Sequence, residues 1–595
     1  MAKSKKYNNK SQGCDSKDEM ANEKYTGKGS NSRRNGNSYK GTNDRSNSNK
    51  FHKVSEHDHQ SNDPMWYMSL KDLVVPATRV SFATQVGAKI PNLLVSSVNN
   101  TPNEGVFINS TTGESVPGIA VLHMINSPGI ATSSTSGVNI AASALFTSIR
   151  KDLATTAPYA AADVLAYALG LDSIYSYYAH LVRLFGTLNV YSGYNLFTPR
   201  TFLSAVYGMS SEAIDDFLNN QANYRSKFNS LIYKASKIYY PYDFSITKRH
   251  TWLYTNYWFD APNLKAQVYA YKPDFVYILD ETYSEQGTAL RPVPVPTTVS
   301  EMLNLFNEMI EVYRNSDSML KIQADMERAF GGRLSSWALE TIPEIYAVVP
   351  AYSQDALEQL TNTEILPLND IIHQAFQNYA SNDNYKTIYN SFCITQSVSK
   401  NIMLYQPTIP PYESTDPDTT GSLEYFNDYK QLLFNNKLLN LITGDSSPER
   451  IVEITRCKPT WTVDNSGNAV MTGCGADICI GGSIYTLSGD NSNRTTLAYP
   501  VRSNLIGGFL DEDGVKKYVT SAKQFTLINA FDWFPTMFTA TPNEEDDSKF
   551  ELLISTDISN YAVADNNMME QLHSVVNTSV WDVPAWGNSK YSGKV

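Results

Sequence analysis

The sequence predicts an α+β fold that is predominantly α-helical, with a β-rich region toward its C-terminal end. From about residue 150 to Tyr240, apolar side chains recur at the i, i+3, i+4 spacing of helices that bury one face. Residues 450–535 instead read as β-rich, with turns at DNSGN, GDNSNR and DEDG. The first 50 residues differ from both regions, because they contain no Leu, Ile, Val, Phe or Trp.

Positive charge is concentrated at the N-terminus of an otherwise acidic chain. The first 50 residues hold 12 Lys and Arg against 5 Asp and Glu, and residues 1–64 hold 13 against 8. The other 531 residues hold 35 basic and 52 acidic side chains. Because 22 of the first 50 residues are Ser, Asn or Gly, burial cannot offset the backbone entropy that ordering would cost. We therefore predict that residues 1–64 are a disordered basic arm.

The remainder has the size and composition of a folded protein with several domains. At 595 residues the chain exceeds one hydrophobic core, and about one domain per 150 residues suggests two to four. Its five cysteines are few and odd in number, which argues against a disulfide framework and favours a reducing compartment. The Lys-rich N-terminus lacks the apolar stretch of a secretory signal, so we expect no export by that route.

The ordered body is expected to start near Met65, with short strand-like pieces to about residue 150. Within it, residues 115–149 contain no Asp, Glu, Lys or Arg but have two prolines and twelve Ser, Thr or Asn. We predict buried or interface-packed chain there and not a membrane span; a membrane-perturbing role is the less favoured alternative.

Helices are predicted next, over residues 172–186, 200–208 and 211–240. In the first, Asp172 or Ser173 would cap the N-terminus and Gly186 would end the helix. Its buried face would consist of the residues with helical spacing, namely Ile174, Tyr177, Tyr178, Leu181, Leu184 and Phe185.

Strands are predicted over residues 250–259 and 265–281, where aromatic and apolar side chains alternate. A Pro-rich connector, RPVPVPTT, precedes an amphipathic helix. A second connector covers residues 405–422, and a last helix is expected from about Met568 to Val576. The stripe of the helix after the first connector consists of Met302, Leu305, Phe306, Met309, Ile310 and Tyr313.

Motifs of enzyme chemistry are missing from the sequence. GCGADICIGG has glycines but no Lys for a phosphate-binding loop, and no Gly-x-Ser-x-Gly occurs. Cys457, Cys474 and Cys479 lack the paired spacing of a zinc site, and HKVSEHDHQ in the arm reads as solvated linker that could bind stray metal. We therefore predict no catalytic residue, no cofactor and no metal site, and keep an enzyme of unrecognised class as an alternative.

Two groups of basic residues favour nucleic acid as a partner. Flexible Lys and Arg neutralise phosphates without fixed geometry, although a mere solubility tail would have the same composition. The arm residues in this hypothesis are Lys3, Lys5, Lys6, Lys10, Lys28, Arg33, Arg34, Lys40, Arg45 and Lys50. A second set lies among aromatic residues that could stack on bases, and comprises Arg225, Lys227, Lys234, Lys237, Lys248 and Arg249. An ordinary surface helix remains the alternative for this second set.

Three segments resemble the capsid proteins of picobirnaviruses and their partitivirus-like double-stranded RNA virus relatives. They are MWYMSLKDLVVPATRVSFATQVG, GLDSIYSYYAHLVRLFGTLNVYSGYNLFTPRTFLSAVYG and YYPYDFSITKRHTWLYTNYWFDAPNLKAQVYAYKPDFVYILDE. The resemblance implies a predominantly α-helical shell domain with a β-containing protruding domain, and not a jelly roll. It also implies homodimers that form a small icosahedral virion around double-stranded RNA after assembly in the host cytoplasm. Cleavage of the arm during maturation is expected between residues 50 and 70.

Combining the resemblance with the residue patterns predicts four parts. They are the arm (1–64), a mainly helical shell domain (65–440, with a β-rich insertion near 245–297), a β-rich and protruding domain (441–540), and a C-terminal segment returning to the shell (541–595). The predicted partners are further copies of the chain and viral RNA, while a host membrane or receptor has no support in the sequence. The main alternative is a host nucleic-acid-associated scaffold protein that forms no closed shell.

Overall fold

The structure is a computed structural model, and its two units are treated separately. These units are Met1–Phe82 and Ala83–Val595. In the first, the structure describes helix α1 (Val74–Thr78); everything below concerns the second. The described residues are 74–79, 118–151, 156–190, 198–242, 244–261, 266–284, 287–332, 334–366, 369–410, 436–442, 446–488, 495–501, 528–542, 550–554, 558 and 560–581. The predicted arm, the onset near Met65 and most of the connector at 405–422 lie outside them.

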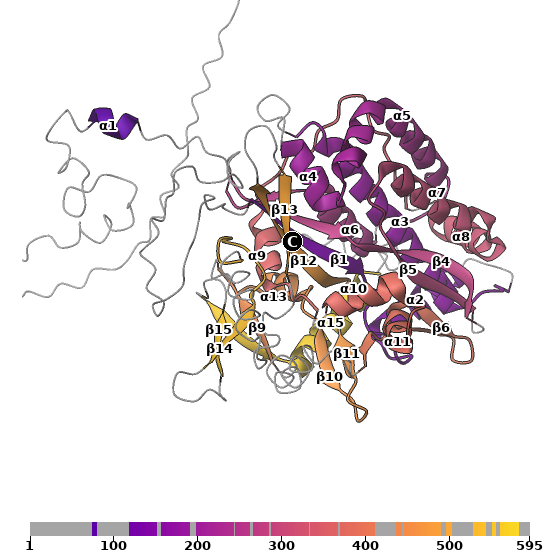
Figure 1. Ribbon diagram of the computed structural model, residues 1–595. Helices are drawn as coiled ribbons and strands as arrows, with labels where there is room; N and C mark the ends of the chain where they lie inside the picture. The colour runs from indigo at the N-terminus through magenta and orange to yellow at the C-terminus, as the bar shows by residue number, and fades with distance from the viewer. Residues whose placement is uncertain are drawn as a thin grey trace, which may run out of the picture. The chain divides into compact units, whose positions relative to one another are not determined.

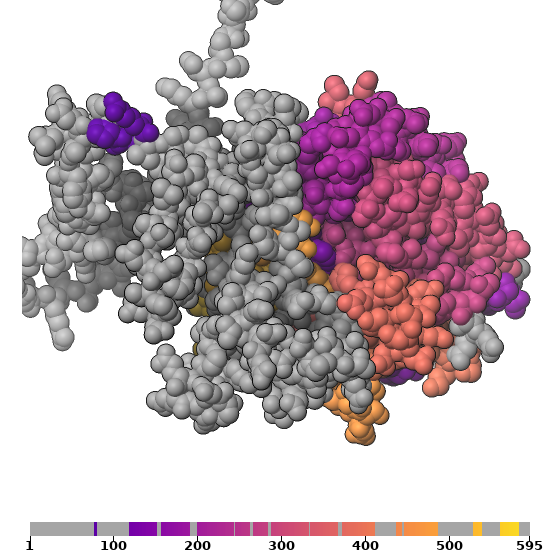
Figure 2. All heavy atoms as spheres, viewed as in Figure 1, coloured from indigo at the N-terminus to yellow at the C-terminus, as the bar shows by residue number. Residues whose placement is uncertain are grey.

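Helix α3 (Ala161–Thr187) is the centre of the helical part (Figure 1). Helices α2 (Gly137–Lys151), α4 (Thr198–Tyr207), α6 (Ser245–Thr255), α7 (Val299–Asn315) and α8 (Asp317–Phe330) contact it. Helix α5 (Ser211–Ala235) packs on α4 and α7. Figure 2 shows the side chains of α5 next to those of α7 and α8 on the surface. The core of the protein therefore surrounds α3, which is buried along nearly its whole length.

Helix α3 begins 11 residues before the predicted start, so the predicted cap is wrong. The Ala- and Leu-rich residues before Asp172 continue the helix, since these side chains lose little freedom in it. The helix instead begins after Ala160, whose backbone N–H donates to the Asp163 carboxylate at 2.9 Å. Asp172 and Ser173 lie buried in the helix interior, where their polar groups face other elements. Five of the six residues of the predicted apolar face are buried, whereas Tyr178 is half-buried. The burial is not confined to one face, because nearly every other residue of α3 is buried too, and the end near Gly186 is confirmed.

A mixed five-stranded sheet has the strand order β13-β12-β1-β3-β2. Strand β1 pairs in parallel with β3 and antiparallel with β12. The strands are β1 (Ile119–Asn126), β2 (Trp258–Phe259), β3 (Val268–Pro273), β12 (Asp477–Ser488) and β13 (Thr495–Val501).

Both faces of this sheet are buried around β1. Val121 belongs to the main core with α3, whereas its neighbour Leu122 belongs to a second core with α9 (Gln354–Asn362). Successive strand side chains point to opposite faces, so a strand buried on both faces needs apolar residues at consecutive positions. The burial predicted for the uncharged segment 115–149 is thereby confirmed for β1 and for one face of α2.

The remaining elements surround the sheet and the helical part. Figure 1 labels most of them. The strands are β4 (Phe275–Ser284), β5 (Gly287–Pro294), β6 (Thr395–Ser397), β7 (Ile402–Leu404), β8 (Thr408–Ile409), β9 (Asn436–Asn440), β10 (Thr460–Val463), β11 (Ala469–Gly473), β14 (Phe538–Pro542), β15 (Phe550–Ile554) and β16 (Tyr561–Asp565). The helices are α10 (Asn369–Asn378), α11 (Asp383–Phe392), α13 (Pro448–Thr455) and α15 (Asn566–Ser579). The fold is α+β with small open sheets among the described residues and is not a jelly roll, as predicted.

Three local predictions are wrong. Residues 250–259 form mostly helix, because α6 buries Ile246, His250 and Leu253 on one face and this burial outweighs the β preference of its aromatic residues. The first half of the predicted Pro-rich connector, residues 291–294, instead lies in β5, paired with β4. The strand-like region predicted up to residue 150 ends in helix α2.

The β-rich region predicted over 450–535 contains β10 to β13 but opens in helix α13, and its residues 489–494 and 502–527 lie outside the described ones. The remaining predicted helices and strands are confirmed. Helices are present at 198–207 and 211–235, strands at 268–273 and 275–284, and the last helix at 566–579. All six residues of the predicted stripe on α7 are buried.

The predicted division into four parts remains a prediction. The central sheet bears on one of them, the protruding domain predicted at 441–540. Strand β12 lies within the proposed protruding domain, yet it pairs with β1 from Ile119↔Tyr485 to Asn126↔Asp477. Strands β12 and β13 therefore belong to the central sheet and not to a separate β-rich domain. No helix within the described ranges is long and apolar enough to cross a membrane.

Candidate functional site

The predicted RNA-facing residues of α5 and α6 fall into two groups. Lys227, Lys237 and Lys248 are exposed, and each ammonium lies over a Tyr ring, at 5.9, 4.4 and 4.5 Å from the centroids of Tyr224, Tyr233 and Tyr242. The rings of Tyr233 and Tyr242 are exposed as well, whereas Tyr224 is buried, so two of the three contacts hold a cation near an aromatic face that solvent reaches.

The other three residues are more constrained by the protein. Lys234 pairs with Glu311 at 2.9 Å, and Arg225 donates to the Pro343 carbonyl at 3.4 Å. The side chain of Arg249 is only 5% exposed and pairs with Asp477. Arg249 therefore does not fit the RNA-facing role predicted for it, because its guanidinium is buried and already paired with a buried carboxylate. The ten arm residues lie outside the described residues.

A buried charge network joins α3, α6 and the central sheet. His250 Nδ1 lies 2.7 Å from Asp172 Oδ2, and His250 Nε2 lies 2.9 Å from Asp477 Oδ1. Asp172 also accepts from Asn126 Nδ2 at 2.9 Å and from the Thr247 hydroxyl at 2.7 Å. The network places buried charges where three chain segments meet, so it holds those segments in one arrangement.

The two carboxylates decide the charge of His250. Burial alone would lower the pKa of this imidazole, but Asp172 and Asp477 raise it from 6.5 to about 10. Arg249 and His250 in turn hold the pKa of Asp477 well below its usual value, although burial opposes its charge. His250 is therefore an imidazolium between two carboxylates at neutral pH.

This protonation predicts a pH dependence of stability. A raised folded-state pKa contributes stability that is complete below the unfolded value of 6.5 and is lost as the pH rises through about 10. The free energy of unfolding should fall across this window by up to about 1.4 kcal/mol per pH unit. Urea unfolding at a series of pH values checks it. A His250→Gln chain should have a smaller slope, and an unchanged slope would contradict this assignment of the proton.

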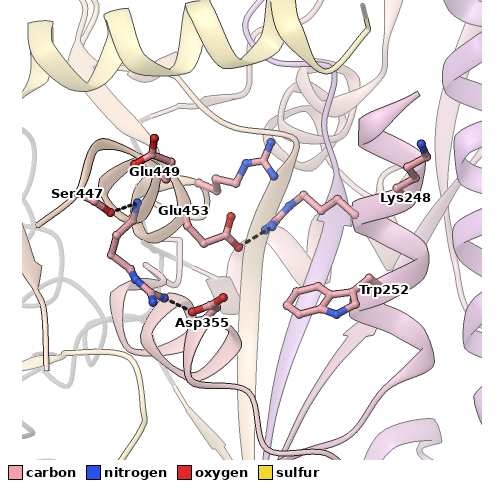
Figure 3. A pocket seen from close by; sticks show the side chains of 9 residues that line it. Lys248, Trp252, Asp355, Ser447, Glu449 and Glu453 are labelled. Carbon is pink, nitrogen blue, oxygen red and sulfur yellow. Dashed lines mark hydrogen bonds and ion pairs between the residues drawn. The ribbon is translucent and has the colours of Figure 1, made fainter. Parts of the chain in front are cut away.

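A surface pocket of about 620 Å³ opens beside this network, between α6 and α13 (Figure 3). In it Arg249 pairs with Glu453 at 3.4 Å, and Arg450 pairs with Asp355. Lys248 and Trp252 project from α6 on the opposite wall. Basic and acidic residues alternate around the pocket, so the lining does not present a uniformly positive surface to RNA. Its residues are Lys248, Arg249, Trp252, Asp355, Ser447, Glu449, Arg450, Glu453 and Arg456.

A second polar cluster lies at the other side of β1. His123 Nδ1 and His373 Nε2 lie 2.8 and 2.7 Å from the same oxygen, Asp274 Oδ2. Lys272 Nζ lies 2.8 Å from the other oxygen of Asp274. Burial lowers the pKa of His123 to about 4, so its ring is neutral at neutral pH. Sequence spacing hides this cluster because its members come from β1, the β3–β4 connection and α10.

The comparison with protein families decides what the chain is. Residues 66–577 match the family model described as Picobirnavirus, Capsid protein. The chain belongs to the picobirnavirus capsid protein family. A capsid protein precursor of human picobirnavirus (strain Human/Thailand/Hy005102/-) is 23% identical to this family member over 545 residues, which is 89% of the chain and 92% of the relative.

The fold agrees with a solved structure of the same kind. An X-ray crystallographic structure of the picobirnavirus capsid matches with a TM-score of 0.68 and 19% identity, covering 87% of this chain and 98% of that one. The resemblance stated from the sequence is therefore confirmed. Membership of a picobirnavirus capsid protein family decides against the host scaffold alternative, and implies a structural, non-enzymatic role in a virion.

Proposed function

We propose that this capsid protein assembles as homodimers into a closed icosahedral shell in the host cytoplasm, and that the shell encloses double-stranded RNA. The observation that carries the proposal is the family match over residues 66–577. The acidic, Tyr-rich body supports it, because Tyr offers a large apolar face and a hydroxyl that tolerates water at subunit contacts.

Electron microscopy tests the assembly directly. Negative-stain images of the expressed full chain should contain uniform hollow spheres, and dispersed monomers would contradict the proposal.

Mass spectrometry of the same particles tests arm cleavage, which we place between residues 50 and 70. Chains that retain an intact N-terminus in mature particles would refute the cleavage.

The arm is the part of the chain that we assign to RNA. It carries a net charge of +7 over its first 50 residues, and the family match begins at residue 66, just after the predicted arm. Phosphate contacts release counterions, so seven such contacts on a duplex would give a slope of log K against log salt of about −6. This charge is modest, so we expect the arm to retain RNA and assist assembly without condensing the genome alone.

The exposed Lys–Tyr pairs of α5 and α6 are the second RNA-facing surface in this proposal. Lys237 and Lys248 support it through their exposure and the exposed rings of Tyr233 and Tyr242, and Lys227 through its exposure alone, because its neighbour Tyr224 is buried. Lys234 and Arg225 are weaker members because each already contacts the protein, and Arg249 is left out.

Neutralising the arm should reduce the RNA content of assembled particles. In the variant, the ten arm residues Lys3, Lys5, Lys6, Lys10, Lys28, Arg33, Arg34, Lys40, Arg45 and Lys50 are replaced by Gln. We expect particles to form, with at least a several-fold loss of packaged RNA and a flatter salt dependence, because the counterion-release contribution is gone.

The matched control exchanges Lys for Arg and Arg for Lys at the same ten positions, which keeps the charge. The ratio of RNA to protein in purified particles, from absorbance and RNA extraction, is the measurement. Normal RNA content in the Gln variant would refute the role of the arm while leaving shell assembly untouched.

A further inference from the structure

Three potential metal ligands converge at one point of the fold from distant parts of the chain. His123 lies on β1, Asp274 in the connection between β3 and β4, and His373 on α10. Their ligand atoms all lie within 4.8 Å of one another. No other group of three or more His, Cys, Asp or Glu in the described part of the chain meets this condition.

We propose that His123, Asp274 and His373 bind a divalent transition metal ion, with Zn²⁺ as the best match. Two imidazoles and one carboxylate are ligands that Zn²⁺ accepts, whereas Ca²⁺ and Mg²⁺ take oxygen ligands. The two imidazole nitrogens already face one carboxylate oxygen at 2.8 and 2.7 Å. A small outward movement of these side chains would place all three ligand atoms around one ion.

The surrounding polar groups orient the proposed ligands. Ser483 Oγ on β12 lies 3.0 Å from His123 Nε2, the ring nitrogen that does not face Asp274. A hydroxyl both donates and accepts, so Ser483 can satisfy this nitrogen whichever tautomer is present. When Nδ1 binds the metal, Nε2–H can donate to Ser483, which is the usual support of a metal-bound His. Lys272 holds the second oxygen of Asp274, which orients the carboxylate in the same way.

The cluster has space and a route for an ion. The side chains of His123, Asp274 and His373 are 13%, 11% and 25% exposed, so an ion can enter from solvent. Gly481 on β12 leaves the space that the two rings occupy, since a Cβ there would lie 3.1 Å from His373 Cε1 and 3.5 Å from His123 Nδ1. Three protein ligands leave a fourth position for water. The ion would link the central sheet to α10 and so stabilise the folded subunit.

Metal binding is tested on the full chain after removal of competing His residues. His52, His57 and His59 in the arm could bind metal themselves, so the reference protein carries Gln at all three. After chelation, this protein is titrated with Zn²⁺ by calorimetry and analysed for metal after dialysis. We expect about one tightly held Zn²⁺ per chain, and a melting temperature that rises with Zn²⁺ concentration.

The decisive variant adds His373→Gln to this reference. His373 is the most exposed of the three ligands, so its replacement perturbs folding least. We expect at least a ~10-fold loss of Zn²⁺ affinity and no stabilisation by Zn²⁺. Unchanged affinity in the variant, or no bound Zn²⁺ in the reference protein, would overturn the proposal.

An independent readout covers the case in which the variant does not fold. Co²⁺ bound to the reference protein should give the intensified visible absorption of four- or five-coordinate cobalt with imidazole ligands. The weak spectrum of aqueous six-coordinate Co²⁺ would overturn the site.

Discussion

Replacing Asp477 with Ala is expected to destabilise the folded subunit by about 3–5 kcal/mol. The Asp477 carboxylate contacts both the buried guanidinium of Arg249 and the buried imidazolium of His250, and the replacement removes it. Glu453 is the remaining acidic partner of Arg249, at 3.4 Å, and its own side chain is 29% exposed. His250 keeps Asp172, at 2.7 Å, so the two buried cations lose one of their two fully buried carboxylates. Removing one partner of a buried ion pair is strongly destabilising, so the loss should appear in the whole subunit.

Urea unfolding of the purified subunit measures this loss, with Asp215→Ala as the matched control. Asp215 also pairs with an arginine, Arg200, at 2.5 Å, but the two side chains are 56% and 45% exposed. Removing this exposed pair should cost less than about 1 kcal/mol, because water screens it. Equal losses in the two variants would mean that the Asp477 network contributes no more than a surface ion pair.

Replacing Phe306 with Ala is expected to cost about 3–5 kcal/mol, through lost burial and the cavity that remains. The Phe306 ring on α7 is fully buried, and its centroid lies 6.1 Å from that of Tyr177 on α3 and 5.6 Å from that of Phe228 on α5. The ring therefore joins three helices. Particle yield should fall with subunit stability, because shells form from folded subunits.

Leu320→Ala on the neighbouring helix α8 is the control for Phe306→Ala. The Leu320 side chain is exposed, at 43%, so its truncation removes little buried surface and should change the free energy of unfolding by less than about 0.5 kcal/mol. Thermal and urea unfolding of both variants check the contrast. A Phe306→Ala subunit as stable as the Leu320→Ala subunit would show that the aromatic contact between α3, α5 and α7 is not a main support of the core.

Phe306 illustrates how much of the fold is readable from the sequence. The stripe on α7 follows from the period of the helix alone, and each of its members is buried. Helix α6 illustrates the limit. Its aromatic run favours strand by local preference, but packing against α3 and β3 makes it a helix. The first 11 residues of α3 are a second limit, because their alanines show no apolar period that marks where the helix begins.

The polar sites also combine features that the sequence predicts with features that depend on packing. The list of basic residues on α5 and α6 came from composition, and the structure separates exposed Lys227 from buried Arg249 within it. Neither Asp172 with Asp477 nor His123 with His373 has a local spacing that indicates a site. A signal was nevertheless present for Asp172, because a carboxylate in the middle of an apolar helix face needs a buried partner.

Four properties of this chain are readable from its amino acids alone: the segregation of basic charge in the arm, the apolar faces of several helices, the lack of catalytic motifs and the resemblance to picobirnavirus capsid proteins. These properties depend on composition and on spacings shorter than one helix, which the backbone geometry of each element makes readable. Three contacts become visible in the folded chain: β12 pairs with β1, Arg249 pairs with Asp477, and His123 and His373 share Asp274. Those contacts join residues far apart in the chain, so they depend on how the elements pack and not on any local pattern.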